Sequence, residues 1–236
     1  MTNPASQPSA ADRRQVIRNS LSVGLAAGSY GVAFGAASVA AGFSPSQTSV
    51  SSLLTFTGGT QFAIAGVVAG GGTAAAALSS GYLLGARNTL YAVRLKPMLA
   101  VRGWRRALAA LVTIDESTAM ALGQPHPKLS RLAFWWTAVG VYVLWNAATL
   151  LGALGTDALG DPAQFGLDAA VPAAFLALVA PRLRSGMLPI RVAVAGALIA
   201  VVLIPLTPPG IPVIAACAAL AVTADVKALR RLRRSE

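Results

Sequence analysis

The sequence predicts an all-α fold, a polytopic bundle of transmembrane helices. From Asn19 to Ala86 the chain contains no Asp, Glu, Lys, Arg or His. Because a helix crosses the bilayer core in roughly 20 residues, this run corresponds to about three crossings. Charged residues make up 11% of the chain and hydrophobic residues 55%, whereas about a quarter of a globular protein is charged. Apolar runs continue to residue 224, so one membrane domain takes up most of the 236 residues.

The membrane domain, residues 20–224, is expected to carry a polar tail at each end. Residues 1–19 form a flexible basic N-terminal tail, and residues 225–236 form a basic C-terminal tail. The net charge of +11 comes from basic residues that flank apolar runs, which is the pattern that sets orientation in a membrane. We therefore expect a multi-pass plasma-membrane protein with both termini in the cytoplasm, surrounded by lipid and without a nucleic-acid partner.

The lengths of the apolar segments favour about eight spans. We expect these spans at 21–42, 46–69, 73–93, 107–122, 133–154, 169–180, 192–206 and 213–224. This topology places the basic residues between 94 and 106 outside, against the positive-inside rule. An alternative with about six or seven spans makes 107–122 re-entrant and lets 46–93 cross only once. Length favours the first topology and charge the second, and we adopt about eight spans.

Small residues mark one face of the first span. Lipid provides no hydrophobic driving force for helix association. A stripe of small residues instead allows two helix backbones to approach closely and pack. We expect it to pack against another helix of this chain, with a partner helix or a moving contact as the alternative. Its members recur three or four residues apart: Gly24, Gly28, Gly31, Gly35, Ser38 and Gly42.

Adjacent glycines, Gly58 and Gly59, are expected to break the second span. The span opens with a Ser44-Pro45 helix start, and an Asp161-Pro162 start recurs before a segment that Pro172 interrupts. This is a weak internal repeat of two halves. Breaks at corresponding positions of two halves point to a transporter binding site made of discontinuous helices. The alternative, weighed about evenly, is a polar seam that only packs.

Ionisable residues lie inside two of the predicted spans. Arg87 is the charged residue of the third span, and Asp115 and Glu116 lie midway in 107–122. Charges at membrane depth are costly and usually pair with each other or face a cavity. We therefore predict that Arg87 lies within reach of one of these carboxylates. The alternatives are that Arg87 snorkels to the interface and that 107–122 is a loop.

Composition argues against metal, cofactor and ATP sites. Cys217 and His126 are the only residues of their kinds, so no disulfide and no zinc site is expected, and no phosphate-binding Gly-x-x-x-x-Gly-Lys-Ser/Thr loop is present. The segment around Ser29 misses the nucleophile-elbow pattern of hydrolases by one residue. A serine nucleophile also needs a base, which makes an intramembrane enzyme the weakest hypothesis.

Several of these motifs together resemble the AzlC-type branched-chain amino-acid exporters, the large subunit of a two-component system. The glycine-rich first span, Gly58 to Phe62, the run from Ala86 to Pro97, and Asp115-Glu116 follow the family's order and spacing over residues 20–122. In the third span the family's Asn-x-Arg-His motif retains only Arg87. The resemblance implies a small AzlD-type membrane subunit as partner and an apolar amino acid as substrate.

The first hypothesis is therefore a permease that exports branched-chain or similar apolar amino acids on the proton gradient. Asp115 and Glu116 are the candidates for proton coupling. The alternatives are a non-catalytic subunit of a transporter for another small molecule and the intramembrane enzyme. The candidate substrate-binding residues are Gly58, Gly59, Gln61, Phe62, Arg87 and Asn88.

Overall fold

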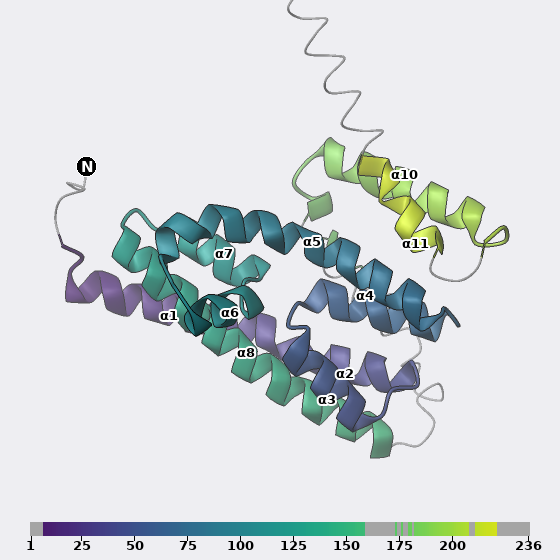
Figure 1. The fold of residues 1–236 in the computed structure, drawn as a ribbon, viewed down its shortest axis with the longest axis horizontal. Helices are drawn as coiled ribbons and strands as arrows, with labels where there is room; N and C mark the ends of the chain where they lie inside the picture. The colour runs from purple at the N-terminus through teal and green to yellow at the C-terminus, as the bar shows by residue number, and fades with distance from the viewer. Residues whose placement is uncertain are drawn as a thin grey trace, which may run out of the picture.

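The computed structural model describes residues 7–158, 173, 176, 179–180, 182–207 and 211–220, and the regular structure in these residues is helical (Figure 1). The elements are α1 (Ala10–Ser29), α2 (Gly31–Ala40), α3 (Pro45–Leu54), α4 (Gly58–Ala69), α5 (Ala74–Leu99), α6 (Trp104–Leu111), α7 (Asp115–Leu122), α8 (Pro127–Ala158), α10 (Met187–Leu203) and α11 (Ile211–Ala216). The longest of the described helices are α1, α5 and α8, with 20, 26 and 32 residues.

The helices α1 and α2 together pack along α8 in the parallel direction. The Ser20 hydroxyl donates to the Ala133 carbonyl, and further along both helices Gly24 lies against Gly140. A Cβ at Gly24 would come within 3.1 Å of the Gly140 backbone, so the two backbones approach as closely as glycine permits. The predicted packing of the small-residue stripe within this chain is confirmed. Gly42 is the exception, because it follows the end of α2 with a φ of +95°, and a Cβ there would meet no atom within 4 Å.

Helix α5 runs antiparallel to α8. The Met98 carbonyl in the last turn of α5 accepts a hydrogen bond of 2.7 Å from Nε of Arg131 in the first turns of α8. Lys128, also at the start of α8, donates to Gln7 just before α1. The start of α1, the end of α5 and the start of α8 therefore lie at one end of the molecule, which we call the N-terminal end (Figure 1).

The segment 46–69 consists of two helices and not of one span. Ser44 caps α3 as predicted: its hydroxyl accepts from the Gln47 N–H, and the Gln47 side chain accepts from the Ser44 N–H. The helix ends at Leu54, and α4 begins at Gly58. The predicted break is confirmed, but it lies at residues 55–57, and both glycines belong to the first turn of α4.

The segment 107–122 is also broken, which corrects the expectation of one continuous span. Helices α6 and α7 each have eight residues, and Val112 to Ile114 separate them. The Ser117 hydroxyl stabilises the turn, because it accepts from the Ile114 N–H and donates to the Val112 carbonyl. Asp115 and Glu116 therefore lie at the N-terminus of α7 and not in the middle of a span.

The expectation of about eight spans is not confirmed. Among the described residues, two helical stretches are long and apolar enough to cross a bilayer, Ala10–Ala40 with 31 residues and Pro127–Ala158 with 32. The last described helices of the chain, α10 and α11, pack on each other beside α5 (Figure 1). Most of the predicted span 169–180, Asp161 and Pro172 of the proposed repeat, and the C-terminal tail lie outside the described residues.

Candidate functional site

A central cavity of about 510 Å³ lies where the two broken segments meet the middle of α5 and α8. The first turn of α4 and the first turn of α7 both face it. Its polar and charged lining comes from Thr57, Arg87, Tyr91, Asp115, Glu116 and Arg182, and its apolar or glycine lining comes from Phe56, Gly58, Gly59, Leu84, Ile114, Val141, Trp145 and Val179.

Two helix N-termini converge on the central cavity. The first backbone hydrogen bond of α4 joins the Gln61 N–H to the Thr57 carbonyl, so the N–H groups of the preceding turn have no partner within the helix. The Thr57 side chain does not cap them. A helix N-terminus carries a partial positive charge from such groups. The N-terminus of α4 therefore favours an anionic group in the cavity near Gly58, whereas the first turn of α7 carries two carboxylates of its own, Asp115 and Glu116.

Arg87 and Asp115 form an ion pair across the cavity. Nη2 of Arg87 lies 3.0 Å from Oδ2 of Asp115, which confirms the predicted pairing of this arginine with a carboxylate. Arg87 lies about three turns, roughly 18 Å, before the end of α5 at Leu99. The other carboxylate oxygen of Asp115, Oδ1, is buried without a hydrogen-bond partner. Both side chains line the cavity and remain partly exposed, so each is in part accessible from it.

The two glycines make room for the side chains opposite α4. A Cβ at Gly59 would come within 3.2 Å of Nη2 of Arg87, and a Cβ at Gly58 would come within 2.9 Å of the Trp145 ring. Any larger residue at these positions would displace the guanidinium or the indole. Gly58 and Gly59 thus act at the cavity through close approach, and the predicted site residues Gly58, Gly59, Arg87, Asp115 and Glu116 all come together there.

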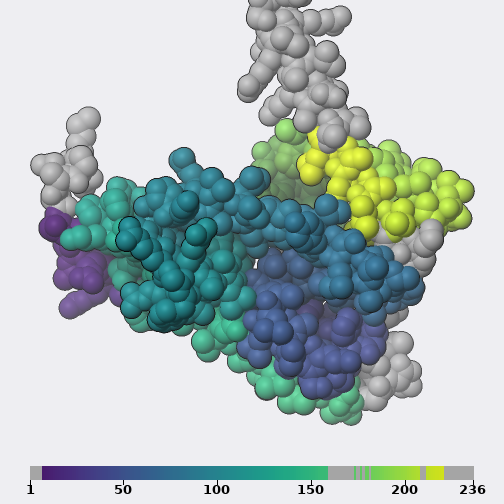
Figure 2. Space-filling model, viewed as in Figure 1, coloured from purple at the N-terminus to yellow at the C-terminus, as the bar shows by residue number. Residues whose placement is uncertain are grey.

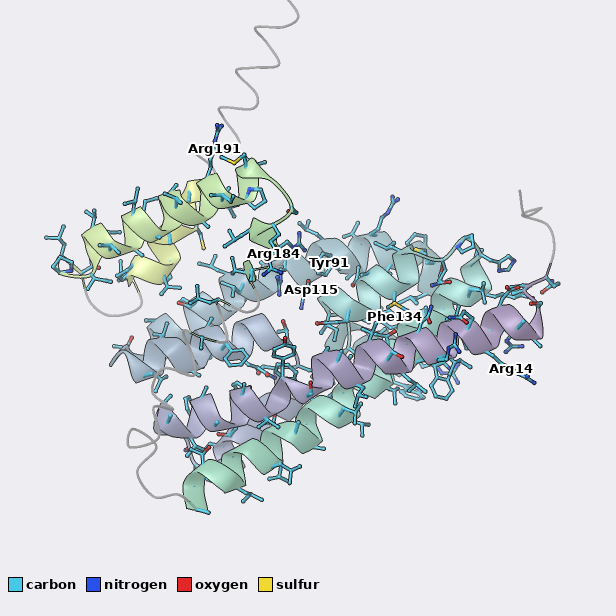
Figure 3. The ribbon with its side chains drawn as sticks, turned by 180° about the vertical axis from the view of Figure 1, so that it is seen from behind. Arg14, Tyr91, Asp115, Phe134, Arg184 and Arg191 are labelled. Carbon is cyan, nitrogen blue, oxygen red and sulfur yellow. The ribbon has the colours of Figure 1, made fainter. Side chains whose placement is uncertain are left out.

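The lining residues that were not predicted from the sequence include Tyr91, Trp145 and Arg182, which are aromatic or charged. Tyr91 lies one turn after Arg87 on the same face of α5, next to Asp115 (Figure 3), and this i, i+4 spacing was the signal that could have identified it. Trp145 lies in the middle of α8, and Arg182 brings a second cation to the cavity. Nothing in the local sequence of Trp145 or Arg182 distinguishes them from packing or interface residues.

Gln61 and Phe62 lie beside the central cavity and not in its lining. The Gln61 amide donates to the carbonyls of Ser52 and Thr55 at the end of α3, and its oxygen accepts a hydrogen bond of 2.9 Å from Nε1 of Trp145. This side chain therefore joins the two halves of the broken segment to α8. The Phe62 ring is buried and packs edge-on against Phe34, with ring centroids 5.5 Å apart.

Asn88 lines a second cavity of about 310 Å³ on the other side of Phe56 and Thr57. The ends of α3 and α6, at Leu54 and Leu111, also line it. Helix C-termini carry a partial negative charge from their carbonyls, and the side-chain oxygen of Asn88 is buried without a partner. The central cavity thus faces two positive helix ends, and the second cavity faces two negative helix ends.

The geometry gives no support to a serine nucleophile. The Ser29 hydroxyl donates to the Ala26 carbonyl at the end of α1, beside the middle of α8. His126 precedes the first turn of α8, where its Nδ1 accepts from the Lys128 N–H. The only histidine of the chain is therefore engaged at a different depth from Ser29.

A comparison with protein families shows to which family the chain belongs. Residues 22–159, more than half of the chain, match the family model described as AzlC protein. This range contains both broken segments and the Arg87–Asp115 pair. No curated protein and no solved structure matches the chain. The chain therefore belongs to the AzlC family, which is associated with the membrane transport of branched-chain amino acids.

Proposed function

We propose that the protein is a permease that exports branched-chain or similar apolar amino acids. One observation carries the proposal: the central cavity combines a guanidinium, two helix N-termini and an apolar wall. Discontinuous helices with these properties form the substrate sites of several transporter folds. A volume of about 510 Å³ lies within the range of about 300–1,000 Å³ that is usual for small-molecule sites.

The substrate carboxylate would bind between Arg87 and the N–H groups of Gly58 and Gly59. Arginine and free backbone N–H groups are both donors to carboxylates. The apolar side chain would lie against Phe56 and Trp145, which line the same cavity. Gln61 and Phe62 would support this wall from behind, since they hold Trp145 in place.

The substrate ammonium group would point toward the second cavity. The helix ends at Leu54 and Leu111 and the unpartnered Asn88 oxygen offer acceptors there. An ammonium group needs acceptors, and a helix C-terminus attracts cations. Phe56 and Thr57 line both cavities, so the second cavity adjoins the wall at which the substrate would bind.

Asp115 and Glu116 are the proposed proton-coupling groups. A substrate carboxylate that binds Arg87 would compete with Asp115, which is 3.0 Å from the same guanidinium. Asp115 would then lose its counter-charge, and an unpaired charge at this depth of a membrane is costly. Substrate binding and proton uptake would thus be linked through one arginine.

The proposed membrane topology follows from the shared N-terminal end. Arg94, Lys96 and Arg102 follow the middle of α5 toward the end where α1 and α8 begin. The positive-inside rule then places this end in the cytoplasm, with α3–α4 and α6–α7 as re-entrant hairpins from opposite sides. This is the alternative topology that the charge distribution favoured. A small AzlD-type membrane subunit remains the proposed partner.

The proposal is tested by amino-acid efflux from dipeptide-loaded cells that express the protein with its small subunit. Loss of a charge-assisted hydrogen bond costs roughly 1.5–3 kcal/mol, so Arg87→Ala should raise the half-saturating leucine concentration about 10- to 100-fold. Arg94→Ala, on the same helix, is the matched control and should change it little. Wild-type efflux by Arg87→Ala would refute the role of the cavity. Efflux unchanged by deleting the protein would refute the function.

A further inference from the structure

We propose that the groove between α5 and α6 binds an anionic phospholipid of the cytoplasmic leaflet. This interfacial groove has a volume of about 370 Å³. It lies outside the central cavity and shares no lining residue with it. Figure 2 shows α5 and α6 side by side on the surface near the N-terminal end of the molecule.

The groove has an apolar floor with cationic side chains at one end. Leu95, Leu99 and Ala109 form part of the floor and are buried. Lys96 and Arg106 line the groove from the last turn of α5 and the first turn of α6. No carboxylate is among the described lining residues. An acyl chain fits the apolar floor, and a phosphate fits the paired cations.

The order of these residues along α5 matches the orientation of a lipid. The lining of α5 runs from Thr89 to Leu99, which is about 15 Å at the rise of an α-helix. This is about half of the hydrocarbon core of roughly 30 Å, or one leaflet. Lys96 lies near the interface end of this stretch, whereas Thr89 lies close to the Arg87 level at mid-depth. The groove therefore places a headgroup at the surface and a chain toward the membrane centre.

The start of the re-entrant helix α6 has the properties of an interfacial anchor at the mouth of the groove. Trp104 and Leu108 are exposed, by 70% and 43%, and Arg105 stacks over the Trp104 ring at 5.7 Å. Tryptophan is enriched at the headgroup level, and basic residues close to the membrane surface attract anionic lipids. The basic residues of this helix thus have exposed apolar anchors beside them, as membrane contact requires.

The test is native mass spectrometry of the purified full-length protein with phosphatidylglycerol or phosphatidylcholine of identical chains. We expect phosphatidylglycerol to be retained preferentially. In the double variant Lys96→Gln/Arg106→Gln its affinity should fall about 30-fold, on the usual contribution of two basic residues at an anionic surface. The matched control is Arg14→Gln/Arg18→Gln, which removes the same charge from the same end but away from the groove. It should keep wild-type affinity.

A second variant tests the contribution of the acyl chain separately from that of the headgroup. Val93→Phe adds bulk to a side chain that lines this groove and neither of the two cavities, at an exposed position and without a change of charge, and it should weaken phosphatidylglycerol binding while folding is preserved. Inorganic phosphate at the same concentration should not displace the lipid. Equal retention of both lipids, an equal loss in the two double variants, or unchanged binding by Val93→Phe would each overturn the proposal.

Discussion

The Arg87–Asp115 ion pair predicts a measurable coupling between two residues of a broken-helix site. Two unit charges about 4 Å apart attract by roughly 4 kcal/mol at an effective dielectric constant of about 20, whereas fully exposed pairs contribute about 0.2–1 kcal/mol. The side chains of Arg87 and Asp115 are exposed by 42% and 39% to the cavity. We therefore expect a coupling free energy between these limits, about 1–2 kcal/mol.

The measurement is a double-mutant cycle of unfolding free energies in detergent. The cycle uses Arg87→Gln, Asp115→Asn and the double variant, and the cycle of Arg94→Gln with Asp115→Asn serves as its control. Arg94 lies two turns, about 10 Å, further along α5 and is exposed, so the control pair should be additive. A coupling below about 0.3 kcal/mol for Arg87 with Asp115, which is within the usual scatter of additivity, would refute the reasoning.

Three further predictions concern the neighbouring groups. Gly59→Ala should lower export with little loss of stability, because its Cβ would come within 3.2 Å of the Arg87 guanidinium; efflux at the wild-type rate would contradict this. Trp145→Phe should lower the unfolding free energy by about 1–3 kcal/mol, since it leaves the buried Gln61 oxygen without its donor, and chemical denaturation in detergent measures the change. In a Cys217→Ser background, Arg102→Cys should react with a membrane-impermeant thiol reagent only from the cytoplasmic side; labelling from outside would restore the topology of about eight spans.

Local rules predicted the features that depend on a few neighbouring residues. The Ser44 cap followed from a Ser-Pro start with Gln47 three residues later. The pairing of Arg87 followed from the cost of an isolated charge in a membrane. The close packing of Gly24 followed from the small-residue stripe. In each case a single physical requirement limited the contacts that the residue could make.

The continuity of the short spans could not be predicted in the same way. Hydropathy sums over a window and so treats 107–122 as one apolar segment, although the chain turns at Val112 to Ile114. No glycine or proline marks this turn; the Ser117 hydroxyl, which bonds two backbone groups, stabilises it. Gln61 shows the converse difficulty. A polar side chain at depth suggests a ligand, but here all its described partners belong to the protein itself.

The close packing of α1 and α2 against α8 at their glycines indicates which part of the molecule is rigid. A Cβ at Gly24 would come within 3.1 Å of the Gly140 backbone, so there is no room for a long side chain between the helices at this point. If α1 and α2 slid along α8, their carbonyl and Cα atoms would collide with those of α8, so we expect the three helices to move as one rigid body. The opposite wall of the central cavity rests on α5, the short helix α7 and side-chain contacts. We therefore expect alternating access to arise when α5 and the hairpins α3–α4 and α6–α7 move relative to the rigid body of α1, α2 and α8.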